Sequence, residues 1–81
     1  MKNLNDNFYT TSDLALIVTL SLFFPVESVE KDESGKAYFS FEQSKKLNKI
    51  IDSFYRDELQ VSPQKFFNQI KTIKSRIYSI I

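Results

Sequence analysis

The fold of this chain follows from its longest apolar run, residues 14–25, LALIVTLSLFFP. Apolar side chains occupy every side of the helix that residues 14–24 would form, so this helix lacks a continuous polar face. A helix of this kind must be covered all round. We therefore expect it to be the central and most buried element, ended by Pro25.

The same run is the only stretch that could target a membrane or a secretion pathway. Eleven residues are too few to span a bilayer as a helix. A signal peptide needs a basic start and small residues at a cleavage site, but Asp6 and Asp13 precede this run and Phe23, Phe24 and Pro25 end it. We expect a cytoplasmic protein without membrane contact, and the absence of cysteine fits a reducing compartment.

The residues before this helix combine a polar lead-in with a helix-start pattern. Residues 1–8 are rich in asparagine and show no periodicity, which predicts a flexible lead-in to one small domain over residues 9–81. Thr10 as N-cap would place Asp13 at the third helical position, an acidic variant of the capping box. Tyr9 and Leu14 would then form a hydrophobic staple.

After Pro25 the pattern changes to that of a β-hairpin. Residues 26–31 and 36–41 are short β-type runs, and the turn formers Asp32–Gly35 separate them. Alternation in the second run predicts three core-facing side chains, Ala37, Phe39 and Phe41.

Two further helices complete the predicted fold. Residues 42–57 carry apolar side chains at helical spacing, with Ser44 or a residue just before it as the cap. Ser62 followed by Pro63 is a strong helix start, and this last helix can run to the terminus. We predict an α+β class: a two-stranded antiparallel hairpin packed on three helices in a compact two-layer domain, in the order helix, hairpin, helix, helix.

The composition excludes most catalytic chemistry. The 81 residues contain no cysteine and no histidine, which removes disulfides, thiolate nucleophiles, zinc fingers and imidazole proton transfer. The carboxylates Glu27, Glu30, Asp32 and Glu33 gather around the hairpin, but their spacing matches no known metal-binding loop. We expect no enzyme activity, no cofactor, no metal site and no small-molecule substrate.

The last helix carries the most informative pattern. Residues 1–34 have two bases and six acids, whereas residues 59–81 have four bases and no acid. At about 100° per residue, Phe67, Lys71, Lys74 and Tyr78 form one stripe, while Lys65 and Arg76 lie on another side. Aromatic rings that bracket cations are typical of single-strand binders. The candidate nucleic-acid-binding residues are Lys65, Phe67, Lys71, Lys74, Arg76 and Tyr78.

Two alternatives stay open for this helix. The two aromatic rings could widen the core face while the lysines extend to water. The C-terminal isoleucines, namely Ile73, Ile77, Ile80 and Ile81, could instead form an interface with a protein partner or a second copy of the chain.

Three segments together resemble a known group of proteins. They are residues 9–16 (YTTSDLAL), the strand end Phe39–Phe41, and residues 61–78 from Val61-Ser62-Pro63 to Tyr78. The group is an uncharacterised domain-of-unknown-function family of small single-domain proteins from bacteria, archaea and their viruses or mobile elements. The resemblance covers residues 9–78 and implies no catalytic residue. It implies a setting in which small proteins bind nucleic acid or a host protein.

Overall fold

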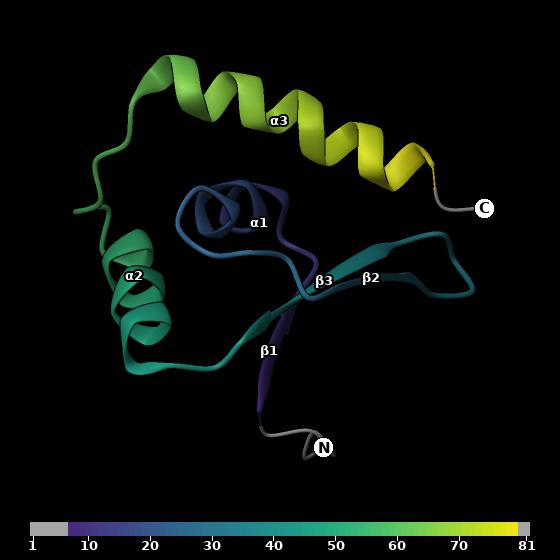
Figure 1. The fold of residues 1–81 in the computed structure, drawn as a ribbon, viewed down its shortest axis with the longest axis horizontal. Coiled ribbons are helices and arrows are strands. Elements are labelled where there is room, and N and C mark those ends of the chain that lie inside the picture. Colours follow the sequence, from purple (N-terminus) through teal and green to yellow (C-terminus); the bar gives the residue numbers. More distant parts are fainter. Residues whose placement is uncertain (1–6, 80–81) are drawn as a thin grey trace.

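The chain folds into a three-stranded antiparallel sheet with three helices, as the computed structural model of residues 7–79 shows (Figure 1). In chain order the elements are β1 (Phe8–Thr11), α1 (Leu14–Ser21), β2 (Ser28–Lys31), β3 (Ala37–Glu42), α2 (Lys45–Tyr55) and α3 (Pro63–Tyr78). The predicted α+β class and the three helices are confirmed. The sheet has one strand more than predicted.

Helix α1 is the centre of the molecule, as expected. Its residues 16–20 are all buried, and Leu16, Val18 and Leu20 have no exposed surface. Figure 1 shows α1 end-on, with α3 above it, α2 to its left and the sheet below. Residues 16–20 are therefore covered on each side by a different element, whereas Leu14 and Phe23 at the two ends of the apolar run remain 38% and 47% exposed. The helix ends at Ser21, earlier than the predicted end at Pro25.

The sheet has the strand order β1-β3-β2, so β3 is its middle strand. Phe39 and Phe41 on β3 are fully buried against the helices, and Ala37 packs at the edge of the same cluster. The opposite face of the sheet carries a hydrogen bond of 2.8 Å between the hydroxyls of Thr10 and Ser40. The predicted inward and outward alternation along β3 is therefore correct.

Strand β1 was not predicted from the sequence. It pairs antiparallel with β3, with Tyr9 opposite Phe41 and Thr11 opposite Phe39. The run Phe8–Thr11 consists of aromatic and β-branched residues, which favour strands, but four residues are too short to show a period. Phe8, assigned above to the lead-in, is the first residue of β1, and residues 1–6 lie outside the described part of the chain.

The predicted N-cap of α1 is wrong by three residues. Asp13 is the cap, and its Oδ1 accepts a hydrogen bond of 3.3 Å from the backbone N–H of Leu16. Thr10 is in β1, where it pairs with Ser40 of β3. This pairing gives the backbone N–H and C=O groups of β1 hydrogen-bond partners, whereas the first N–H groups of a helix have none within the helix. The hydroxyl of Thr11 accepts from the N–H of Asp13 at 3.1 Å and so links the strand to the cap.

The other helix boundaries follow local signals. Ser44 caps α2 and Ser62 caps α3, as predicted. Helix α2 ends at Tyr55, short of the predicted residue 57, because Asp57 adopts a left-handed conformation with φ 60°. The N–H groups of Asp57 and Glu58 then donate to the carbonyls of Phe54 and Ser53, a Schellman ending.

Cap position gives the first test. We expect Asp13→Ala to lower the free energy of unfolding by about 1 kcal/mol, because the N–H of Leu16 loses its acceptor. Thr10→Val keeps the β-branched shape and loses only an exposed hydroxyl contact, so its cost should be about 0.5 kcal/mol or less. Urea unfolding of both variants measures this, and the reverse order would contradict the assigned cap.

The hairpin turn gives a second test. Asp32 Oδ1 accepts from the hydroxyl and N–H of Ser34 at 2.6 and 2.9 Å, and from the N–H of Lys36 at 3.0 Å. These bonds, led by the Ser34 hydroxyl, hold the pKa of Asp32 below its ordinary 3.8. Because the pKa of Asp32 is lower in the folded protein than in the unfolded chain, these bonds stabilise the fold at pH values above 3.8. This stabilisation is lost as the pH falls through the pKa that Asp32 has in the folded protein.

We therefore expect Ser34→Ala to raise the pKa of Asp32 toward 3.8 in an NMR titration of its carboxyl carbon. Ser28→Ala, on β2 and outside these bonds, is the matched control and should leave the pKa unchanged. An Asp32 pKa that does not respond to Ser34→Ala would contradict the assigned bonds.

Candidate nucleic-acid interface

Helix α3 positions all six predicted binding residues. It begins at Pro63, whose missing N–H costs nothing at the first helical position, and the Oγ of Ser62 accepts from the N–H of Lys65 at 3.3 Å. The helix has 16 residues, so it extends over about 24 Å at 1.5 Å per residue.

One side of α3 is fastened to the core. Ile73 is 1% exposed, and Phe66, Ile70 and Ile77 pack against the same cluster. On this side the Nε2 of Gln69 donates a hydrogen bond of 3.0 Å to the hydroxyl of Ser21 at the end of α1. The rotation of α3 about its axis is therefore set by packing against α1.

This rotation turns the predicted stripe toward solvent. Phe67 is 59% exposed and Tyr78 is 75% exposed, and Lys71 and Lys74 are exposed between them. We call these four residues the aromatic–basic stripe. The alternative in which the two rings widen the core is wrong, because both rings lie outside it.

A contact within the stripe joins a cation to a ring. The Nζ of Lys71 lies 5.0 Å from the centroid of the Phe67 ring, within the range of a cation–π interaction. Lys71 follows Phe67 by one helical turn, and its side chain reaches back so that the ammonium lies over the ring.

Lys65 and Arg76 do not join the stripe. By helical geometry they lie about 160° around α3 from it, and both are exposed. Lys65 borders a hollow of about 250 Å³ between α1 and the start of α3. The other residues around this hollow are Leu22, Phe23, Gln60, Val61 and Ser62. The six candidates therefore form two groups on opposite flanks of α3.

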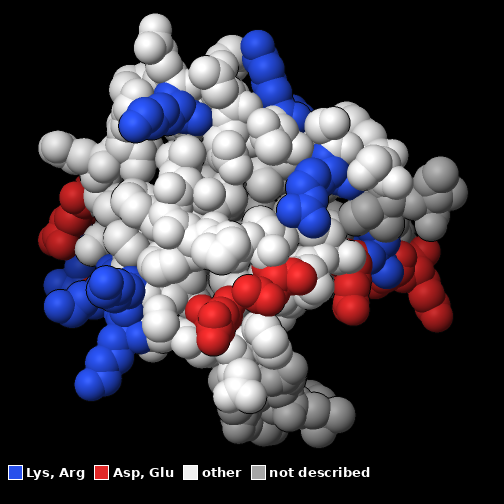
Figure 2. All heavy atoms as spheres, in the orientation of Figure 1, with Lys and Arg blue, Asp and Glu red and all other residues white. Residues whose placement is uncertain are grey.

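The surface over α3 is basic without compensating acids. Residues 59–79 contain four bases and no acid, and within residues 7–79 none of these four bases forms an ion pair. In Figure 2 the coloured side chains over the upper part of the molecule, where α3 lies, are all basic. Acidic side chains appear at the level of the sheet and α2.

The isoleucines predicted to form an interface pack into the chain's own core, as far as the structure describes them. Ile73 has almost no surface to offer a partner, and Ile77 is half-buried in the same core. Ile80 and Ile81 lie outside the described residues. The isoleucines of α3 that the structure describes thus serve the fold of a single chain.

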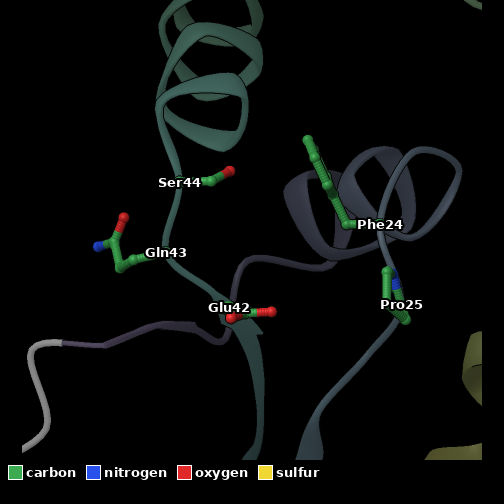
Figure 3. A pocket seen from close by; sticks show the side chains of 5 residues that line it. All are labelled: Phe24, Pro25, Glu42, Gln43 and Ser44. Atoms are coloured by element: carbon green, nitrogen blue, oxygen red, sulfur yellow. The ribbon is translucent and has the colours of Figure 1, made fainter.

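A second hollow, of about 250 Å³, lies between the end of α1 and the segment that joins β3 to α2 (Figure 3). Its apolar wall is Phe24 and Pro25, and Glu42 and Ser44 point toward that wall while Gln43 points away. The Ser44 hydroxyl already accepts from the N–H of Leu47 at 3.0 Å. Among the residues that line this hollow, Glu42 supplies the one carboxylate.

Within residues 7–79 no three carboxylates come together in an arrangement that could hold a metal ion. None of the helices in this range has the length and hydrophobicity needed to cross a membrane.

Comparison with family models identifies the chain. Residues 6–79 match the model of the domain of unknown function DUF5659. The chain belongs to this family. The match includes β1 and extends through the capping residue Ser79, so the DUF5659 unit coincides with the folded domain described above. Neither curated proteins nor solved structures gave a match.

Proposed function

We propose that this domain is a non-catalytic module that binds nucleic acid through the aromatic–basic stripe of α3. One observation carries the proposal: two exposed rings bracket two lysines on the outer side of a helix that has no acid. Lysines that lack ion pairs can contact phosphates and release counterions, and exposed rings can stack on bases.

The placement of the stripe supports this use. Phe67 and Tyr78 are 11 positions apart, about 16 Å along the helix axis, and Lys71 and Lys74 lie between them. Anchoring of α3 by Gln69 and Ile73 fixes the backbone from which these side chains project. A ligand that binds the stripe therefore orders side chains but does not have to order the helix itself, which limits the entropic cost of binding.

Charge reversal tests the proposal. We expect the double variant Lys71→Glu, Lys74→Glu to weaken binding of a fluorescently labelled 20-nucleotide strand at least tenfold at 50 mM salt, measured by anisotropy. For the parent protein, two phosphate contacts predict a log–log salt slope of about −1.4 on a single strand. Circular dichroism checks that the variant remains folded.

The matched control is Lys45→Glu, Lys46→Glu. It makes the same change of charge on the exposed first turn of α2, where negative groups favour the helix dipole. It should retain binding within about threefold, the allowance for screened long-range charge. Equal losses in the two double variants would contradict a site on α3, and a parent protein that binds no nucleic acid would overturn the proposal.

The second candidate function is a protein-interaction or self-associating module, and self-association would double the mass of the particle in solution. Since Ile73 and Ile77 pack into the chain's own core, we instead expect light scattering after size exclusion to give the monomer mass of 9.5 kDa. A species of twice that mass at micromolar concentration would favour self-association, and loss of that species in Ile80→Ser, Ile81→Ser would assign it to the C-terminal isoleucines.

A further inference from the structure

A hollow opens beside the aromatic–basic stripe, at the first turn of α3. It is lined by Pro63, Gln64, Phe67 and Asn68 and has a volume of about 620 Å³. The hollow is open, so a flat group that stays attached to a longer chain can enter it.

The lining divides into two kinds of surface. Pro63 and Phe67 are four residues apart and lie side by side on the helix, as do Gln64 and Asn68. The first pair is apolar. The side-chain amides of the second pair make no hydrogen bond within residues 7–79, so their donors and acceptors are available to a ligand.

This combination matches the chemistry of a nucleobase. A base has a flat face that stacks on an aromatic ring, and an edge that presents donors and acceptors together. Side-chain amides also carry both a donor and an acceptor and can pair with such an edge. An aliphatic ligand would leave the two amides unused.

The position of Lys71 suits the phosphate of a nucleotide as well as its base. Pro63 and Gln64 lie one turn before Phe67, so the hollow borders the ring on its N-terminal side. The Nζ of Lys71 lies 5.0 Å from the ring centroid, one turn after it. A stacked base in the hollow would thus have a cation close to its own backbone phosphate, with Lys74 and Tyr78 farther along the strand.

We propose that the ligand is single-stranded nucleic acid, with one unpaired base stacked on Phe67 in this hollow and its edge contacting Gln64 and Asn68. The inference rests on the proposed function and narrows it. In a duplex the faces of the bases are covered by their neighbours and the Watson–Crick edges are occupied, so a duplex offers this surface phosphates and groove edges but no base face that could stack on Phe67.

The experiment compares three probes of equal length and label: a 12-nucleotide single strand, its duplex, and a 12-unit abasic strand that keeps the phosphates. We expect the single strand to bind at least tenfold more tightly than the duplex or the abasic strand. Phe67→Ala should weaken single-strand binding about five- to hundredfold, the cost of one lost stacking contact, and should change abasic binding by less than twofold.

Tyr55→Ala is the matched control, since it removes a ring of similar exposure (62%) from α2. It should leave all three affinities within twofold. The double variant Gln64→Ala, Asn68→Ala should weaken single-strand binding at least threefold and abasic binding by less than twofold.

The outcomes separate this inference from the proposed function. Equal binding of the three probes, with loss in Lys71→Glu, Lys74→Glu, would overturn the base site and retain a phosphate-binding stripe. A Phe67→Ala protein that binds the single strand as well as the parent would also overturn the base site. Failure to bind any probe would overturn both.

Discussion

The sheet and the two outer helices are organised around the burial of α1. Residues 16–20 are buried on every side, and a chain of this size without cysteine or histidine lacks disulfides and the usual zinc ligands as other sources of stability. The sheet contributes Phe39 and Phe41 to this core, α2 contributes Leu47 and α3 contributes Ile73. The orientation of the sheet, α2 and α3 is therefore fixed by the apolar side chains that each of them packs against α1.

The candidate binding surface is a consequence of that arrangement. Because α3 gives its isoleucines and Gln69 to α1, the flank with Phe67, Lys71, Lys74 and Tyr78 remains outside. An exposed phenylalanine beside a lysine is not unusual on its own. The case for a site comes from the combination of two rings, two cations without ion pairs, and a hollow with two available amides at one end of the row.

Local signals in the sequence were strongest where neighbouring residues alone determine the structure. The Ser62-Pro63 start of α3, the Ser44 cap and the Asp32–Gly35 turn are satisfied by bonds over a few residues, such as those that Asp32 accepts. Strand β1 is different, because Tyr9 and Thr11 acquire their conformation from Phe41 and Phe39, some thirty positions away. Thr10 also fits a capping pattern locally, and only pairing with β3 decides against it. The hollow beside Phe67 gave no signal because its amides belong to common surface residues.

Hydrophobic period and capping chemistry act over short distances, so the sequence was enough to predict the central helix, the hairpin, the two later helices, and the side of α3 on which two rings bracket two lysines. Tertiary structure alone decided that Phe8–Thr11 is a strand, that Phe67 and Tyr78 lie outside the core, and that Ile73 and Ile77 lie within it. The physical reason is that exposure is a property of packing. A side chain on the border of a helix's apolar face is covered only where a neighbouring element packs against it, and here α1 packs against the side of α3 that carries Ile73.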